Sequence, residues 1–244
     1  MIKSKVLNKI KMDANEISIQ RADSSLSIDG LEDVLTTLWL KIKNDTLAQG
    51  IKIWDGLYYR VENLDELETS GKKLLLSTIS YSRVRALIEY SKTNPLTLSQ
   101  FPLHINTGAM VKSADNIFVF GKKDIHGKPS IDIVGGGLQE DELEVTLGHD
   151  LEKNILKEMH EEINVSKKHV SSARINGFIL TSTMSLIIVF EIDLNITFSE
   201  IKELFELREE FEFSEIIGVE EESISNFLLA QHGRYISLIQ ALME

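Results

Sequence analysis

Cysteine is absent from this 244-residue sequence. Its absence excludes disulfides, zinc–thiolate sites and thiol nucleophiles, and leaves no sign of an oxidising compartment. Long apolar runs are absent too, because the longest, residues 186–190, has only the length of a strand. Residues 1–11 alternate lysine with single apolar residues, which is typical of neither a signal peptide nor a membrane-spanning helix. We therefore expect a cytoplasmic protein that does not insert into a membrane.

Basic residues are scarce relative to acidic ones. The chain has 26 Lys and Arg against 38 Asp and Glu, a formal net charge of −12. Proteins bind nucleic-acid backbones largely by neutralising phosphates with Lys and Arg, so we expect no nucleic-acid partner. An anionic small molecule would need a metal ion or a local positive feature.

The length allows one large domain, or a catalytic domain with a smaller appendage. Pro95 and Pro102 bracket the connector TLSQF, which is the best candidate boundary. We expect an N-terminal accessory α+β domain over residues 1–98 and a second domain over residues 99–244.

Apolar periodicity predicts helices alternating with strands. Helices are expected over residues 31–42, 82–91, 151–163, 200–209 and 223–243, and strands over 73–80, 104–111, 116–120, 130–134, 175–180, 186–192 and 213–219. Residues 51–61, with Asp55-Gly56 at the centre, have the pattern of a β-hairpin. Alternating strands and helices imply an α/β or α+β fold.

The most informative pattern is Gly135-Gly136-Gly137 followed by the helix that carries Glu158, Glu161 and Glu162. At about 100° per residue, the three carboxylates share one sector of the helix and repel one another. A divalent cation would remove that penalty, and Mg²⁺ prefers hard oxygen ligands shared with substrate phosphates. Ile155 and Met159 lie off the sector and can pack the helix onto a sheet. Asn164 follows the helix and tolerates the left-handed conformation that ends many helices.

These residues resemble the Nudix hydrolase family, whose signature is G-x5-E-x7-R-E-U-x-E-E-x-G-U, where U is aliphatic. Gly136 and Glu142 match its first part, and residues 157–165 match its second. Lys157 replaces Arg, Asn164 replaces Gly, and Val134 stands where Pro usually precedes the glycines. Fourteen residues rather than seven separate Glu142 from Lys157. The resemblance covers roughly residues 103–227.

The resemblance implies a Nudix-type mixed sheet between helices and a pyrophosphohydrolase acting on a nucleoside diphosphate linked to another group. It implies Mg²⁺, or Mn²⁺, bound by Glu158, Glu161 and Glu162, with Lys157 orienting these carboxylates and metal-activated water attacking phosphorus. Substrate phosphates would meet the remaining candidates, which are Gly135, Gly136, Gly137, Lys122 and Lys123. Homodimers are common among such enzymes.

The family often uses one further carboxylate from a later loop. Glu209, Glu210 and Glu212 are the nearest candidates here, and Glu210 is the residue we select. The hairpin motif Trp54-Asp55-Gly56, with Tyr58 and Tyr59 after it, is similar in arrangement to Nudix proteins that act on UDP-sugars.

Simpler interpretations exist for each feature. A glutamate run by itself is usually a solvated helix face, three glycines can be a flexible turn, and lysines at 122 and 123 can be ordinary surface residues. The aromatic cluster is more often packing than a stacking surface. His160 is expected to be exposed, whereas His149 could serve as a base or ligand. The alternative function is a Nudix-fold nucleotide-binding or regulatory module without catalysis.

Overall fold

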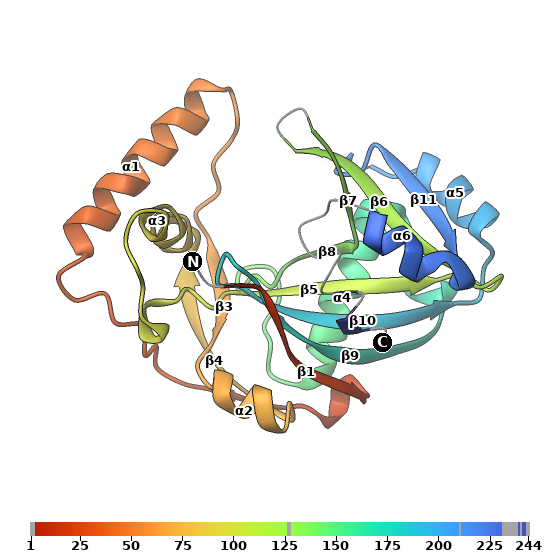
Figure 1. The fold of residues 1–244 in the computed structure, drawn as a ribbon, viewed down its shortest axis with the longest axis horizontal. Helices are drawn as coiled ribbons and strands as arrows, with labels where there is room; N and C mark the ends of the chain where they lie inside the picture. Colours follow the sequence, from red (N-terminus) through yellow and green to blue (C-terminus); the bar gives the residue numbers. More distant parts are fainter. Residues whose placement is uncertain (1–2, 126–127, 210, 231–238, 240, 243–244) are drawn as a thin grey trace.

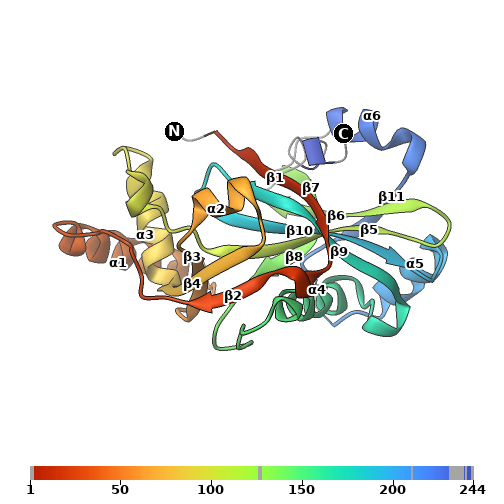
Figure 2. The ribbon, with the colours of Figure 1, turned by 90° about the horizontal axis from the view of Figure 1, so that it is seen from below.

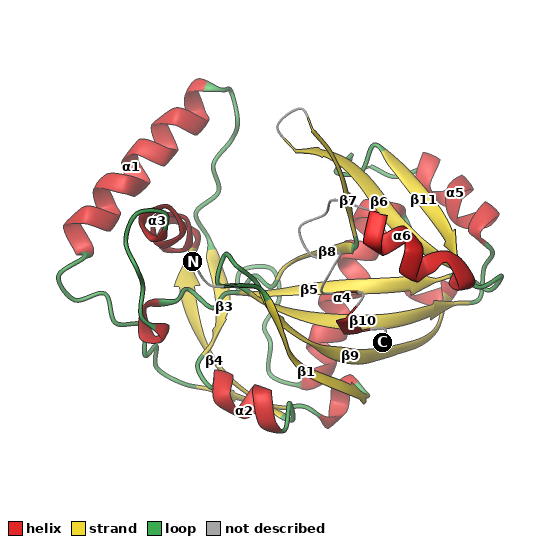
Figure 3. Ribbon diagram, viewed as in Figure 1, coloured by secondary structure: helices red, strands yellow, loops and turns green. Residues whose placement is uncertain are grey.

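The chain forms a large mixed sheet and a separate small sheet, both accompanied by helices (Figure 1). This computed structural model describes residues 3–125, 128–209, 211–230, 239 and 241–242. The predicted fold class is confirmed: the fold is α+β, with a mixed main sheet between helices and a smaller α+β unit near the N-terminus (Figure 3). Within the described ranges, no helix is both long and apolar enough to cross a membrane.

The main sheet divides beside strand β5 (Ile105–Lys112), which pairs with two different strands along one edge. Its order is β1 (Lys5–Met12), β9 (Val170–Leu180), β10 (Leu186–Leu194), β5, β6 (Ile117–Ile125) and β11 (Glu215–Glu220), with β7 (Lys128–Asp132) paired to β6 and β8 (Val134–Gly137) paired to β5. The β5–β10 pair is parallel, and the other pairs are antiparallel. On its free side β5 meets β8 over residues 106–109 and β6 over residues 111–112. The three glycines therefore line the N-terminal half of β5.

Both faces of this sheet are buried, because strand β10 carries apolar side chains on both of its faces. Ile188 and Phe190 pack into the core beneath α4 (Gly148–Ile163) and α5 (Phe198–Glu206), while Ile187 and Val189 pack on the opposite face with α6 (Ile224–Ala230). Successive side chains of a strand point to opposite faces, so a run of apolar residues fits a strand covered on both sides. Figure 2 shows the sheet between α4 and α6.

The small sheet has the order β2 (Ser18–Arg21), β4 (Lys73–Ser80), β3 (Leu57–Val61). Helices α1 (Glu32–Ala48) and α3 (Tyr81–Ser91) pack on it around Leu35, Val84 and Leu87, and α2 (Leu64–Thr69) contacts β1. Short 3₁₀ turns occur at Ala14–Glu16, Leu98–Gln100, Lys167–His169 and Glu221–Ser223.

Strand β3 connects the small sheet to the main one. Its free edge pairs with the segment after the glycines, where the Tyr59 amide donates to the Leu138 carbonyl at 2.9 Å and the Glu140 amide donates to the Leu57 carbonyl at 2.8 Å. The buried side chain of Arg60, on β3, forms an ion pair with Glu62. Strand β1 precedes the small sheet in sequence but lies in the main sheet. The division of the chain at residue 98 stays a prediction.

Most expected elements are present, but three expectations were wrong or incomplete. Residues 51–56 form no strand, because β3 pairs with β4 instead of a hairpin partner and the Trp54 ring packs on Tyr58 and Tyr81. The strand expected over residues 130–134 ends at Asp132 as β7, and Val134 and the three glycines form a strand of their own, β8. The long C-terminal helix is described from Ile224 to Ala230, and residues 231–238 lie outside the described residues.

Candidate metal and phosphate site

Helix α4 presents its acidic residues to the glycine strand. The helix starts at Gly148, where the Asp150 carboxylate accepts hydrogen bonds from the amides of Thr146 and Leu147 at 3.0 and 2.9 Å. It ends at Asn164, whose φ of 55° is the left-handed conformation expected from the sequence. Between these ends, α4 packs on β8 and β5.

Two of the three predicted metal-binding glutamates are buried. Glu158 and Glu162 are 9% and 3% exposed and share the inner side of α4 with Ile155 and Met159. The expected separation into a buried side and a charged side is therefore wrong for these two carboxylates. One Glu162 oxygen accepts a hydrogen bond from the Gly135 amide at 2.9 Å. The other, Oε1, is buried and has no hydrogen-bond partner among the described residues.

Burial makes both carboxylates poor anions in the absence of a cation. It raises the pKa of Glu158 to about 7, a rise that Glu161 and Glu142 reinforce and Lys157 opposes. Burial raises the pKa of Glu162 to about 9, and the negative charge of Glu212 is the next largest cause. Placing carboxylates together in a water-poor site costs free energy that a bound cation would return.

The glycines are needed here because side chains occupy the space beside them. A Cβ on Gly136 would lie 2.3 Å from Oε2 of Glu158, and a Cβ on Gly137 would lie 2.2 Å from the Tyr58 ring. Both distances are far below van der Waals contact. The backbone can therefore approach the Glu158 carboxylate on one side and the small sheet on the other.

Lys157 is partly exposed and lies among three carboxylates of the site. Its ammonium lies 2.6 Å from Glu142, 3.4 Å from Glu161 and 3.6 Å from Glu158. Burial alone would lower the pKa of Lys157, but these three carboxylates raise it above its ordinary value. Glu161 is about one-third exposed, at 31%. As they stand, the described residues contain no group of three or more Asp, Glu or His side chains arranged to hold a metal ion.

The segment that lengthens the motif does not separate Glu142 from the helix. Its last residues, Gly148 to Asp150, form the first turn of α4, and Glu142 reaches Lys157 from the turn before it. His149 therefore belongs to helix α4 and is exposed. His160 is exposed as well, as the sequence predicts.

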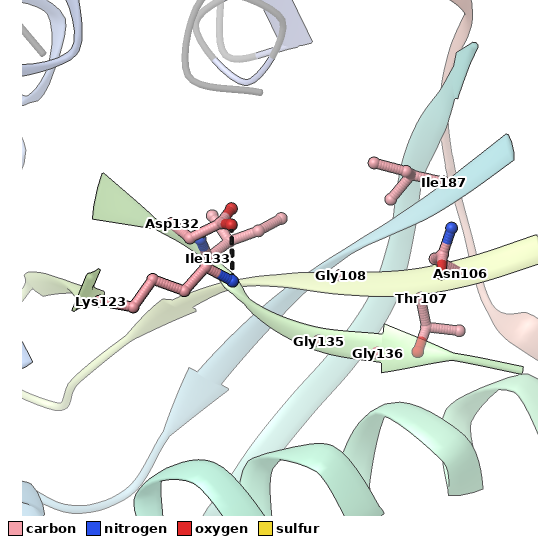
Figure 4. A pocket seen from close by; sticks show the side chains of 9 residues that line it. All are labelled: Asn106, Thr107, Gly108, Lys123, Asp132, Ile133, Gly135, Gly136 and Ile187. Carbon is pink, nitrogen blue, oxygen red and sulfur yellow. Dashed lines mark hydrogen bonds and ion pairs between the residues drawn. The ribbon is translucent and has the colours of Figure 1, made fainter. Parts of the chain in front are cut away.

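A cavity of about 160 Å³ lies beside the glycines, as Figure 4 shows. It is lined by Asn106, Thr107, Gly108, Lys123, Asp132, Ile133, Gly135, Gly136 and Ile187. Three of the five predicted substrate-binding residues, Gly135, Gly136 and Lys123, thus share one cavity. Gly137 contacts Tyr58 instead.

The two neighbouring lysines have different surroundings. Lys123 lies 2.9 Å from Asp132 and 3.0 Å from Glu212 and is 20% exposed. Burial alone would lower the pKa of Lys123, but these two carboxylates raise it above its ordinary value. Lys122 is absent from the cavity lining and pairs with Glu215 of β11 at 3.1 Å.

Of the downstream carboxylates, Glu212 lies nearest to the site in the described part of the chain. It contacts Lys123, and its charge raises the pKa of both Glu158 and Glu162. Glu210, the residue selected from the sequence, lies outside the described residues. Sequence reasoning missed Asp132, whose only signal is an acid at the end of a buried strand.

The comparisons with known proteins concern the fold. No family model matches the chain, and no curated protein matches its sequence. The structure is similar to solved structures of many Nudix hydrolases over most of the chain, at low sequence identity.

Three of these structures give the scale of the similarity. Tm1382, described as a candidate Nudix hydrolase, is 17% identical over 82% of this chain and 95% of its own, with a TM-score of 0.47. DR0079 from Deinococcus radiodurans is 14% identical over 77% of this chain and 99% of its own, with the same TM-score. The Nudix domain of Shewanella oneidensis NrtR, solved with ADP ribose, is 9% identical over 64% and 95%, with a TM-score of 0.40. At these values the similarity carries no inference about activity, which depends on the side chains.

Proposed function

We propose that this protein is a metal-dependent pyrophosphohydrolase that cleaves the diphosphate of a nucleoside diphosphate linked to another group. The observation that carries the proposal is the pair of buried carboxylates, Glu158 and Glu162, beside the glycine strand. A solvated helix face would not bury them. Their order in the sequence, with Lys157 and Glu161, is the order that the Nudix signature requires.

The donor set fits Mg²⁺ or Mn²⁺. Carboxylate oxygens are the ligands that these hard cations prefer, and the buried Oε1 atom of Glu162 lacks a partner among the described residues. Glu158, Glu161 and Glu162 would hold the ion. When bound, the cation supplies positive charge that stabilises the anionic phosphate and activates water.

The chain's own residues orient this site. The Gly135 amide holds one Glu162 oxygen, leaving the other free to bind. Lys157 holds Glu142, Glu158 and Glu161 together by charge. Residues that fix ligand carboxylates in this way commonly change metal affinity by about 10–100-fold when replaced.

The cavity beside Gly135 and Gly136 can take only part of such a substrate. Its volume of about 160 Å³ is below the ~300–1,000 Å³ of pockets that enclose a whole drug-sized ligand. We assign it to a phosphate or sugar portion. Lys123 already pairs with Asp132 and Glu212, so a substrate phosphate would have to share Lys123 with these carboxylates.

The test is release of a nucleoside monophosphate from a panel of nucleoside diphosphate derivatives, with and without Mg²⁺. Glu161→Gln and Glu162→Gln should each abolish metal-dependent release, while Glu203→Gln, at an exposed position of α5, should not change it. Release that continues without metal, or in Glu162→Gln, would contradict the proposal.

One observation favours the alternative, a nucleotide-binding or regulatory module without turnover. The Lys157 ammonium already lies within 4 Å of three of the carboxylates, so the cluster has a cation of its own. This alternative predicts that ADP raises the melting temperature while no derivative is hydrolysed with Mg²⁺ or Mn²⁺.

A further inference from the structure

The small sheet holds the segment that carries Glu142. The hydroxyl of Tyr59, on β3, accepts hydrogen bonds from the Val145 amide at 2.9 Å and from Arg21 at 2.9 Å, and donates one to the Leu143 carbonyl at 3.1 Å. A phenolic hydroxyl has one donor and two acceptor positions, so all of its bonding capacity is used. Glu142 lies immediately before the residues held in this way.

Arg21 adds a second attachment from the neighbouring part of the small sheet. Its guanidinium stacks 4.5 Å from the centre of the Tyr59 ring and pairs with Glu140 at 2.9 Å. Asp141, which like Glu140 precedes Glu142, accepts a hydrogen bond from the Leu57 amide at 3.3 Å through its carboxylate. Residues before and after Glu142 are therefore hydrogen-bonded to strands β2 and β3 of the small sheet.

Packing alone does not explain Tyr59. Its side chain is fully buried, at 0% exposed, and a phenylalanine would fill nearly the same space. What phenylalanine lacks is the hydroxyl, and its loss would leave the buried Val145 amide without its partner. The hydroxyl acts on the backbone of the segment, and the segment determines where Glu142 stands.

We infer that Tyr59 is a positioning residue of the site: by fixing residues 143–145 it holds Glu142 against Lys157 and so orders the carboxylates of α4. The small sheet is then part of the site and not an appendage to it. This role rests on the proposed function in one respect, that the ordered carboxylates bind a divalent cation. It assigns a use to the residues that lengthen the motif, because they provide the backbone groups that Tyr59 binds.

The first experiment measures the attachment in the full chain without metal. Hydrogen exchange of the amides between residues 138 and 147 is compared in the unsubstituted protein, Tyr59→Phe and the control Tyr90→Phe, on α3. Tyr59→Phe should speed exchange at Val145 at least about 10-fold, because breaking its hydrogen bond removes local protection. Tyr90→Phe should not change it. Unchanged exchange at Val145 in Tyr59→Phe overturns the inference.

The second experiment asks whether Tyr59 acts through Glu142. The Kd of Mn²⁺ is measured by titration calorimetry for Tyr59→Phe, Glu142→Gln and the double variant. Tyr59→Phe should raise the Kd by about 10-fold, the usual effect of losing a group that orients ligands. In the Glu142→Gln background the same change should have less than about a 2-fold effect, because coupled residues are not additive. Equal effects in both backgrounds would reduce Tyr59 to a structural role and overturn the inference.

The outcomes separate this inference from the proposed function. If the unsubstituted protein binds Mn²⁺ and the two residues are coupled, but no substrate is hydrolysed, the hydrolase proposal fails and the positioning role stands. If the unsubstituted protein binds no Mn²⁺, both the hydrolase proposal and the coupling to metal fail. Hydrogen exchange then still decides whether Tyr59 holds the segment.

Discussion

The ammonium of Lys157 lies 2.6 Å from a carboxylate oxygen of Glu142, although fourteen residues separate them in the sequence. The pair persists because the intervening residues divide into a turn bound to the small sheet and a first turn added to α4. The additional residues between Glu142 and Lys157 thus lie partly in the turn after Glu142 and partly in the first turn of α4. An enlarged motif can in this way keep the pairing of its charged residues.

Glu162→Gln should stabilise the metal-free protein while removing function. The substitution removes a buried carboxylate with a strongly raised pKa, so we expect a gain of about 2 kcal/mol in the free energy of unfolding at pH 7, measured by urea denaturation in EDTA. Metal-dependent kcat should fall at least about 100-fold, or ~2.7 kcal/mol. A less stable Glu162→Gln protein would argue that the carboxylate is already well compensated without metal.

Lys123 and Lys122 provide a matched pair. Lys123→Met should weaken ADP binding about 10-fold, or ~1.4 kcal/mol, because Lys123 lines the cavity beside the glycines. Lys122→Met should leave the Kd within about 2-fold, since Lys122 pairs with Glu215 away from the cavity lining. Calorimetric titration with ADP and Mg²⁺ measures both values. Equal effects of the two substitutions would place the phosphate elsewhere.

Asp150 should make stability depend on acid pH. Burial would raise the pKa of Asp150, but bonds from Lys153 and two backbone amides outweigh it and lower the pKa to about 2. Because the folded pKa lies below the unfolded value of about 3.9, the contribution is present above pH 4 and is lost as the pH falls toward 2. We expect Asp150→Asn to cost about 2 kcal/mol at pH 7 and almost nothing at pH 2.

Urea denaturation of Asp150→Asn across this pH range, with Asp45→Asn at an exposed position of α1 as the control, gives the measurement. A difference that stays constant from pH 7 to pH 2 would show that the carboxylate charge is not what stabilises the start of α4.

Arg60 and Glu62 should be strongly coupled. Both side chains are almost fully buried, at 2% and 4% exposed, and Arg60 also donates to the Phe101 carbonyl at 3.3 Å. Arg60→Met leaves the buried Glu62 carboxylate without its cationic partner, and among the described residues only the hydrogen bonds from Ser25 and Ser77 remain. We therefore expect a loss of about 3–5 kcal/mol in the free energy of unfolding. The double variant Arg60→Met/Glu62→Met should recover most of it. Chemical denaturation of the three variants measures the coupling, and additive losses would contradict it.

The sequence predicts individual elements well where local chemistry determines them. Strand β4 spans Lys73–Ser80 as expected, and Asn164 ends α4 with positive φ. The hairpin prediction failed because local turn chemistry at Asp55-Gly56 could not reveal that β3 has better partners in β4 and the residue 138–140 segment. Pairing between distant segments is not encoded in any single stretch.

In the candidate site, too, the sequence predicts what local spacing determines and misses what depends on contacts between distant segments. Helical spacing alone placed Glu158, Glu161 and Glu162 together, but it could not tell which of them the sheet would bury. Lys122 and Lys123 are indistinguishable in sequence, since their surroundings depend on how β7 and β11 align with β6. The bonds of Tyr59 to Leu143 and Val145 join residues that are 84 and 86 positions apart in the sequence.

Strand β1 has a consequence for how the molecule is made. Lys5 pairs with Leu180 and Met12 with Ile175, so β1 can take its place in the sheet only after β9, far later in the sequence, has been synthesised. Contacts between such distant residues slow folding, and the β9 edge stays open until β1 closes it. A fragment of residues 99–244 would expose that edge permanently, and we expect it to associate with itself through β9.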